Sequence, residues 1–386
     1  MKINQNSNTH RYFIVALTLN LLYFGAFLSA APFGPTKTDW PMFRGHQDLS
    51  GIASASLPDS LKLDWTFKTD SIVKSSPAIV SNKVYFGDEE GIVRCLNLKD
   101  AKKIWEFKTE GAIESSPLVL KGIVYIGSSD GFLYALKADN GQLVWKFETQ
   151  DQILGSPNWM KSPKGESNWI VFGSYDYLLY AVDAQTGKQV WNYESGNYIN
   201  GSPAVSNGQT VFGGCDALLH VINLKDGSQD KEIDAEAYIA GSATVVDGRA
   251  YVGHYENEFL CVDLKKGEIV WKYRDKGFAY FSSPAITGDK VIFGGRDKRL
   301  HCVNRKTGKS IWKFATRGKV DSSPVVVGSK VVVGSDDGHL YMVNIKDGEE
   351  IWSYEIGEPV TSSPAVIENT VIIGAEDGNV YCFRKK

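Results

Sequence analysis

Short runs of apolar and polar residues recur along the chain from residue 61 to its end. In one unit the runs are Ser76–Val80, Lys83–Gly87, Ile92–Leu98 and Lys103–Phe107. Each is rich in β-branched or aromatic residues and is bounded by turn residues, a pattern typical of β-strands. We therefore expect four short antiparallel strands in every unit.

A tryptophan in the last strand marks the period of the repeat, which is about 40 residues, a length typical of propeller blades. It occurs at Trp65, Trp105, Trp145, Trp191, Trp271, Trp312 and Trp352, and Lys231 takes its place in one further unit. Some ten residues later comes a Ser-Ser or Gly-Ser pair, usually followed by proline. Four strands repeated eight times predict an all-β chain forming a single eight-bladed β-propeller.

The phase of the repeat predicts how the ring closes. The repeat begins with a tryptophan strand, Leu61–Lys68, and the last unit has only three strands and ends near Phe383. The N-terminal strand should therefore complete the last blade and remove the open edge. The alternative is a linear solenoid, which requires capping repeats, and none is recognisable. Residues 31–60 form a lead-in segment, which we expect to pack against the ring or its rim.

Residues 1–30 have the pattern of a secretory signal peptide. Lys2 and Arg11 precede a mostly apolar run, Tyr12–Ala31, that ends in small residues. This order is typical of a cleaved export signal, and we place cleavage after Ala30. An uncleaved anchor is the alternative, because the run is long enough to span a bilayer. We expect residues 61–386 to be exported, to the periplasm or the cell exterior, with membrane contact only if the anchor is retained.

Composition excludes several classes of protein. The 42 Lys+Arg and 45 Asp+Glu residues give a net charge of −3 without a basic block, which argues against a nucleic-acid binder. The apolar fraction of 43% is too high for a disordered chain. The sequence contains no motif of a nucleophile and base or of a metal site, so we expect no catalytic residues and no metal. A closed ring also favours a monomer.

The unit Ser115–Phe147 resembles the pyrroloquinoline quinone (PQQ) repeat, and Asp39–Gly45 resembles the lead-in that often precedes it. This resemblance implies a propeller but not an activity, since the repeat builds both quinoprotein dehydrogenases and non-enzymatic, BamB-like propellers. The dehydrogenases carry two adjacent cysteines beside the cofactor and long insertions. No two of the five cysteines here are adjacent, and the single insertion within the ring, Trp159–Trp169, is short.

We therefore expect a scaffold that mediates protein–protein interaction in the cell envelope, BamB-like, with an envelope or outer-membrane protein as partner and no cofactor. One alternative is a small PQQ-dependent dehydrogenase with PQQ and Ca²⁺ in the channel. The other is a carbohydrate-binding propeller that stacks sugars on Tyr198, Tyr238 and Phe278.

Candidate site residues lie in the loops between blades, which vary most and are where function is usually placed. The weak candidates for cofactor binding at the channel mouth are Lys74, Glu114, Asn200 and Asp321. The candidates for partner binding are Tyr198, Tyr238, Phe278, Tyr280 and Phe281 in the loops of the middle blades, and Trp159 and Trp169 in the insertion. The insertion is either a docking loop or a hairpin pinned by its tryptophans. Free blade edges could also accept a strand from a partner.

Two further columns of the repeat allow two interpretations each. An acidic residue stands in the hairpin between the second and third strands of every unit: Glu90, Asp130, Asp176, Asp216, Glu256, Asp297, Asp337 and Asp377. These residues either stabilise the turns by bonding to the local backbone or form an acidic ring that attracts cations. Cys95, Cys261, Cys302 and Cys382 share an apolar column and are either buried thiols or disulfides. We favour turn chemistry and buried thiols.

Overall fold

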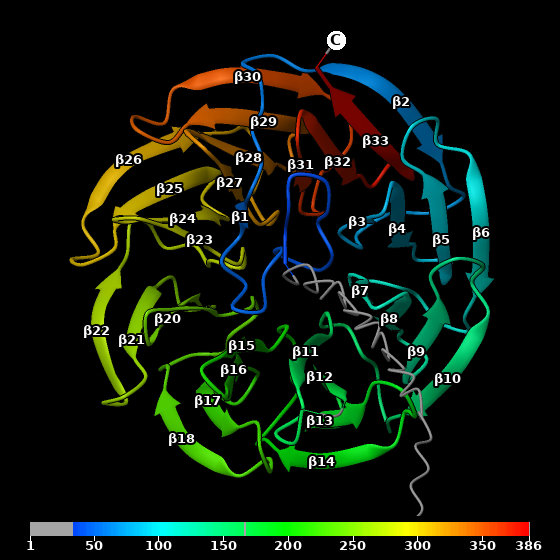
Figure 1. Ribbon diagram of the computed structural model, residues 1–386. Helices are drawn as coiled ribbons and strands as arrows, with labels where there is room; N and C mark the ends of the chain where they lie inside the picture. Colours follow the sequence, from blue (N-terminus) through cyan, green and yellow to red (C-terminus); the bar gives the residue numbers. More distant parts are fainter. Residues whose placement is uncertain (1–33, 166, 386) are drawn as a thin grey trace, which may run out of the picture. The chain divides into compact units, whose positions relative to one another are not determined.

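Eight antiparallel sheets surround a common axis in the computed structural model, which describes residues 34–165 and 167–385 (Figure 1). Each sheet is a four-stranded blade, and one blade gains a fifth strand. No helix occurs among the described residues, and so none that could span a membrane. The proposed signal peptide lies outside them. The single ring confirms the eight-bladed propeller predicted from the repeat.

The strands follow the order inner to outer within each blade. The innermost strands are β3 (Ala78–Val80), β7 (Leu118–Leu120), β11 (Asn158–Lys161), β15 (Ala204–Ser206), β19 (Thr244–Val246), β23 (Ala285–Thr287), β27 (Val325–Val327) and β31 (Ala365–Ile367). The second strands are β4 (Lys83–Gly87), β8 (Ile123–Gly127), β12 (Asn168–Gly173), β16 (Gln209–Gly213), β20 (Arg249–Gly253), β24 (Lys290–Gly295), β28 (Lys330–Gly334) and β32 (Thr370–Gly374).

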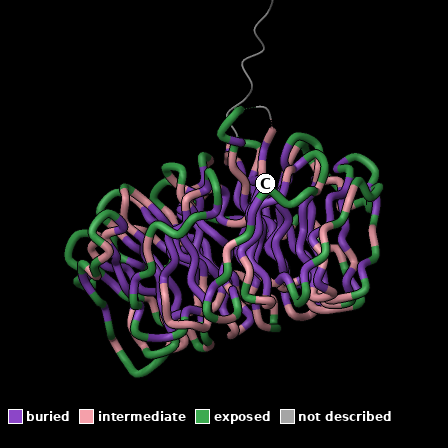
Figure 2. Tube along the Cα trace, turned by 90° about the horizontal axis from the view of Figure 1, so that it is seen from below, coloured by how far each residue is buried: buried purple, intermediate pink, exposed green. Residues whose placement is uncertain are grey.

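The third strands are β5 (Ile92–Asn97), β9 (Phe132–Lys137), β13 (Leu178–Asp183), β17 (Leu218–Asn223), β21 (Phe259–Asp263), β25 (Arg299–Asn304), β29 (His339–Asn344) and β33 (Asn379–Arg384). The outermost are β6 (Lys103–Lys108), β10 (Leu143–Glu148), β14 (Gln189–Glu194), β18 (Gln229–Asp234), β22 (Glu268–Tyr273), β26 (Ser310–Ala315), β30 (Glu350–Glu355) and β2 (Lys62–Lys68). We number the blades 1 to 8 in the order of their innermost strands. The three inner strands of each blade are mostly buried, and the outermost strands and the hairpins at both faces carry most of the exposed residues (Figure 2).

The two ends of the repeat meet in blade 8, as predicted. β2 pairs antiparallel with β33, with Lys62 opposite Arg384 and Lys68 opposite Asn379. Figure 1 shows the blue strand beside the red one. This pairing leaves the ring without an open blade.

A closed circle of hydrogen bonds explains the second serine of each Ser-Ser or Gly-Ser pair. Its backbone N–H donates to the Oγ of the matching serine in the next blade, at 2.8–3.1 Å. The circle consists of Ser76, Ser116, Ser156, Ser202, Ser242, Ser283, Ser323 and Ser363, and the N–H of Ser363 donates to Ser76 Oγ. Because these N–H groups are buried, each would otherwise lack a partner. The serine thus joins blades rather than serving a site.

The repeated tryptophan joins five of the blades to the next through the same contact. The Trp105 ring packs on Gly141 in the turn of blade 2, where a Cβ would lie 2.7 Å from the ring, and its Nε1 donates to the Ala138 carbonyl at 3.0 Å. The same indole contact and hydrogen bond recur at Trp145, Trp191, Trp271 and Trp312. Lys231 replaces this residue in blade 4, so the junction of blades 4 and 5 lacks the indole.

The lead-in segment lines the channel instead of the rim. Its backbone carbonyls accept the N–H groups on the free edges of the innermost strands, from Pro41 with Val119 (2.8 Å) in blade 2 to Gly51 with Val326 (2.9 Å) in blade 7. β1 (Ile52–Ala53) then pairs parallel with β27 and forms the fifth strand of blade 7. The blue segment at the centre of Figure 1 follows this path. The lead-in therefore satisfies donors that the propeller alone leaves open.

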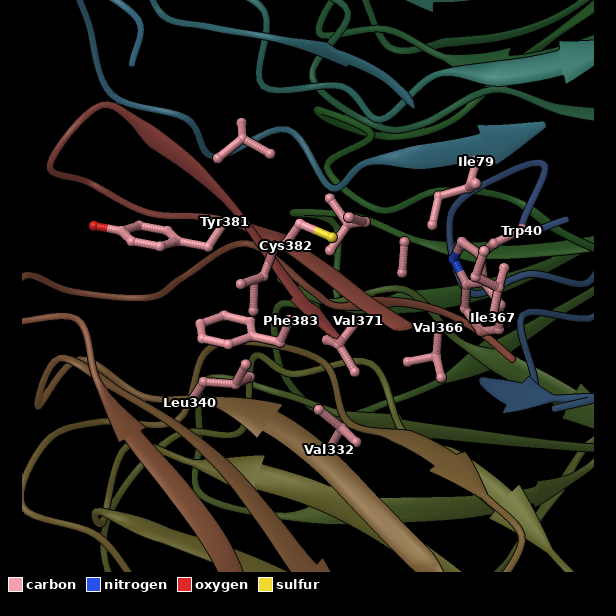
Figure 3. Packing of buried hydrophobic residues seen from close by; sticks show 14 of the residues in the cluster. Trp40, Ile79, Val332, Leu340, Val366, Ile367, Val371, Tyr381, Cys382 and Phe383 are labelled. Atoms are coloured by element: carbon pink, nitrogen blue, oxygen red, sulfur yellow. The ribbon is translucent and has the colours of Figure 1, made fainter. Parts of the chain in front are cut away.

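Two buried side chains fix this segment. Trp40 is 2% exposed and lies beside Ile79 and Ile367 in the core of blades 1 and 8 (Figure 3). Arg44 is 1% exposed, and its guanidinium donates to the Pro284 and Pro324 carbonyls at 2.8 and 2.6 Å. Burial lowers the pKa of Arg44 to about 9. No carboxylate lies within ion-pair distance of it in the described part of the chain.

The four cysteines of the apolar column are free and buried, which confirms their prediction as core thiols. Burial raises the pKa of Cys95 to about 12. Cys215 is partly exposed, and its Sγ accepts a hydrogen bond from Asn200 Nδ2 at 2.9 Å.

Candidate functional site

Two rings of residues surround the channel mouth on the face that carries the loops between blades, here called the loop face. The first ring precedes the serine circle: Lys74, Glu114, Leu154, Asn200, Ala240, Phe281, Asp321 and Thr361, all partly buried. The second ring lies at the start of the hairpin between the second and third strands: Glu89, Ser129, Tyr175, Cys215, Tyr255, Arg296, Asp336 and Glu376. Each second-ring N–H donates to a loop carbonyl, for example from Tyr175 to Gln152 at 2.9 Å.

Blades 6, 7, 8, 1 and 2 make one side of the mouth charged. Lys74 Nζ lies 2.5 Å from Glu89 and 3.7 Å from Glu114. Arg296 binds Asp321 through both Nε and Nη2, the latter at 2.8 Å. The cofactor candidates Lys74, Glu114 and Asp321 are therefore already paired with protein groups.

Asp336 is a partly buried carboxylate that has other carboxylates as neighbours on this side of the mouth. Burial, and then the carboxylates of Asp321 and Glu376, raise the pKa of Asp336 to about 6. Its Oδ1 has no hydrogen-bond partner in the described part of the chain. The nearby cations Lys319 and Arg296 offset this effect only in part.

Blades 3 to 6 make the other side aromatic. We define the aromatic sector as Tyr175, Tyr177, Tyr198, Tyr238, Tyr255, Phe278 and Phe281. Five of these side chains are well exposed: Tyr177 and Tyr198 at 39%, Tyr255 at 47%, Phe278 at 49% and Tyr238 at 54%. The other large exposed apolar residues among those described lie on the outermost strands. Exposed rings gathered in this way mark a binding surface.

Ring contacts hold much of the aromatic sector in place. Tyr198 stacks on Tyr175 with centroids 4.9 Å apart, and Tyr255 packs on Phe281 at 4.5 Å. The Arg296 guanidinium lies over the Phe281 ring at 3.7 Å, a cation–π arrangement. The sector is thus pre-organised, which lowers the entropy cost of binding.

The structure corrects one predicted contact residue and adds three. Tyr280 is 1% exposed and packs on Phe259 and Phe293 in the core, so it cannot contact a partner. Tyr175, Tyr177 and Tyr255 were missed, because the hairpin that carries them was interpreted only through its acidic column. Their signal was available, since no other blade has aromatic residues beside that column.

The acidic column serves turn chemistry. In blade 2, Asp130 Oδ1 accepts the N–H of Phe132 at 3.0 Å, and Oδ2 accepts the hydroxyl of Tyr134 at 2.7 Å. Tyr180, Tyr341 and Tyr381 repeat the second bond, and His220 and His301 replace the phenol with an imidazole. The two glutamates of the column, Glu90 and Glu256, are exposed. Four residues after them stand Arg94 and Leu260, in place of the tyrosine or histidine found in the other blades. The aspartate carboxylates of the column therefore already accept hydrogen bonds from the protein.

One cluster of acidic residues and a histidine has the spacing of a metal site, but its carboxylates already pair with protein cations. Asp275, Asp297 and His301 bring their ligand atoms within 4.8 Å of one another. The Arg299 guanidinium lies 3.3 Å from Asp275 and 3.6 Å from Asp297. Lys313 also contacts Asp275, at 2.6 Å. These protein cations neutralise the carboxylates, and a metal would have to displace them.

The channel mouth does not suit PQQ, which carries several carboxylates. Around it, Glu89, Glu114, Asp321, Asp336 and Glu376 outnumber Lys74, Arg296 and Lys319. The raised pKa of Asp336 shows that even a protein carboxylate is disfavoured there. Asn200, the remaining candidate, bonds Cys215. A polyanionic cofactor would meet repulsion at this mouth.

The insertion and the rim offer weaker surfaces. Trp169 and Met160 pack against the core of blades 3 and 4, and Trp159 is half-buried, so the insertion has the features of a pinned hairpin. Every outermost strand carries a β-bulge before its tryptophan position, as at Ile104 between Lys103 and Trp105. Bulges at edges disfavour the addition of a further strand.

The fold and the repeat together define an eight-bladed propeller of PQQ-type repeats. The chain belongs to the family described as the β-propeller of the beta-alanine-activating enzyme, which matches residues 161–385. The β-propeller domain of glucose, ethanol and alcohol dehydrogenases also matches, over residues 97–210. No curated protein matches the sequence.

Solved structures share this fold at low sequence identity. BamB from Moraxella catarrhalis is 20% identical with a TM-score of 0.69, covering 84% of this chain and 100% of its own. Quinohemoprotein alcohol dehydrogenase ADHIIG from Pseudomonas putida HK5 is 14% identical with a TM-score of 0.74, covering 90% and 80%. The computationally designed Ika8 protein is 15% identical with a TM-score of 0.72, covering 87% and 99%. These likenesses establish the propeller and leave its function open.

Proposed function

We propose that this propeller is a non-catalytic scaffold that holds a protein partner on the aromatic sector of its loop face. The observation that carries the proposal is the group of five well-exposed aromatic rings on adjacent blades. Tyrosine and phenylalanine supply large contact areas with few rotatable bonds, and they are enriched in protein interfaces. The paired, net-negative channel mouth supports binding at the surface rather than cofactor chemistry inside.

The proposed setting is the cell envelope. The signal-like pattern of residues 1–30 supports export, and the shared fold with BamB is compatible with a BamB-like role. The proposed partner is an envelope or outer-membrane protein. The charged sector next to the aromatic one would favour a partner segment that combines apolar and basic side chains.

A photo-crosslinking amino acid placed at single surface positions tests this proposal in the source cells. Tyr238 and Phe278 report on the aromatic sector, and Ile104 and Ile311 are matched rim controls with 41% exposure each. We expect one defined adduct from both sector positions and none from the rim. Adducts of equal yield from all four positions, or from the rim alone, would contradict the proposal.

A further inference from the structure

A pocket of about 480 Å³ opens on the loop face at the junction of blades 4 and 5. Its wall includes Tyr238 and Tyr255, two of the exposed rings, together with the carboxylates Glu236, Glu256 and Glu258. Arg274 and the imidazole of His254 complete the polar lining. This volume lies within the range of small-molecule sites.

His254 brings a buried donor to this pocket. It stands after the second strand, where the other blades have Asp, Ser, Gly or Ala, and it is 1% exposed. Its Nδ1 accepts the backbone N–H of Glu256 at 3.0 Å, so the neutral ring carries its proton on Nε2. Burial lowers the pKa of His254, which keeps the ring neutral. Nε2 has no hydrogen-bond partner among the described residues.

The groups around Glu258 leave hydrogen-bonding capacity for a ligand. Its carboxylate lies 3.8 Å from His254 Nε2, 3.6 Å from Lys272 Nζ and 3.4 Å from Arg274 Nη2. All three separations exceed a normal hydrogen bond. Lys272 Nζ donates instead to Glu236, and Arg274 Nη2 donates to the Glu256 carbonyl at 3.2 Å. The His254 N–H alone lacks a hydrogen-bond partner among the described residues, so it remains available to a ligand.

The sequence departs from the repeat at this junction more than elsewhere. Lys231 replaces the tryptophan that clamps the other blades, Ala243 replaces the proline after the serine circle, and His254 replaces a small or acidic residue. Such losses of local consistency concentrate at functional sites. The exposed rings of Tyr238 and Tyr255 lie at the same junction. We therefore interpret these departures from the repeat as features of one binding site.

We propose that this pocket binds a pyranose sugar. A sugar presents an apolar face that stacks on aromatic rings, and its adjacent hydroxyl groups both donate and accept. The pocket offers the matching set: two exposed tyrosine rings, carboxylate acceptors, and Arg274 and His254 as donors. A purely cationic ligand would pair with the carboxylates of the wall but would leave the His254 N–H without an acceptor. The inference goes beyond the proposed protein partner and does not depend on it.

Saturation-transfer NMR on the purified protein tests this assignment. The probes are the methyl pyranosides of glucose, mannose, galactose and N-acetylglucosamine at millimolar concentration. We expect at least one to receive saturation, and Tyr238→Ala and Tyr255→Ala each to weaken its binding about tenfold, since an aromatic contact contributes up to about 1.5 kcal/mol. Phe278→Ala removes an equally exposed ring that does not line the pocket and should leave binding unchanged.

Three results would overturn the assignment. The first is no transfer to any of the four sugars. The second is transfer that persists in both tyrosine variants. The third is pocket-dependent transfer to N-acetyl-arginine amide in place of the sugars, which would identify a basic anchor of a protein partner. Glu256→Gln separates sugar binding from cation binding, because it should abolish cation binding while only weakening sugar binding. Loss of the sugar signal would leave the Phe278 crosslink intact, so the two proposals fail separately.

Discussion

Replacing Trp40 by alanine is expected to lower the free energy of unfolding by about 3 to 5 kcal/mol, the usual cost of truncating a buried aromatic residue. The indole is 2% exposed and fills space between blades 1 and 8. Its backbone also exchanges two hydrogen bonds with Ile79, at 2.6 and 2.8 Å. Loss of the ring should loosen the lead-in and expose the innermost strand edges. Denaturant unfolding followed by tryptophan fluorescence and circular dichroism measures the change.

Lys37→Ala is the control for this prediction. Lys37 lies in the same segment but is exposed, and its contribution to blade 8 is a backbone carbonyl that accepts from Glu368. We expect a change below about 0.5 kcal/mol, typical of surface substitutions. Equal stability of the Trp40 and Lys37 variants would show that the lead-in does not support the ring.

Replacing Trp105 by alanine is expected to cost about 3 kcal/mol or more, because it removes a buried ring and its hydrogen bond. The Ala138 carbonyl would keep only the hydroxyl of Tyr85 as a donor among the described residues. Trp105 is 7% exposed and joins blade 1 to blade 2 through Gly141 and Ala138. The lost contact should also speed hydrogen exchange at that junction before the others. Mass spectrometry of exchanged peptides locates the effect.

Trp352→Ala provides the matched comparison. Trp352 occupies the same position in blade 7, but blade 8 takes its outermost strand from the N-terminal side of the chain and has no turn between its third and fourth strands. Trp352 is also more exposed than Trp105. Its replacement should cost clearly less than that of Trp105. Equal costs would mean that the tryptophans act through their own blade and not through the clamp.

The strands, the blade count and the ring closure could be predicted from the sequence, because they depend on local periodicity. The turn glycines, the tryptophan column and the phase of the repeat all predict the same four-stranded blade. The first strand of blade 1 starts at Ala78 and not at Ser76, since proline precedes it and the serine serves the interblade circle. The buried cysteines followed from their apolar column for the same reason.

The path of the lead-in and the composition of the site could not be predicted. The carbonyls of residues 41–51 bond to strands as far away in the sequence as Val326, which bonds Gly51, and backbone bonding leaves no trace in a sequence. The burial of Tyr280 beside the exposed Phe278 depends on which way one loop turns. The pocket at blades 4 and 5 combines residues of two blades, and its signal in the sequence, the local loss of the repeat, does not specify which side chains meet there.

Calorimetric titration of PQQ with Ca²⁺ into the purified protein tests most directly whether the propeller works through its surface and not through a cofactor. The account predicts no saturable heat, because the carboxylates at the mouth outnumber the cations, and Lys74 and Arg296 are already paired. Saturable one-to-one binding that is lost in Asp321→Ala and Lys74→Ala would contradict the account and place an oxidoreductase site in the channel.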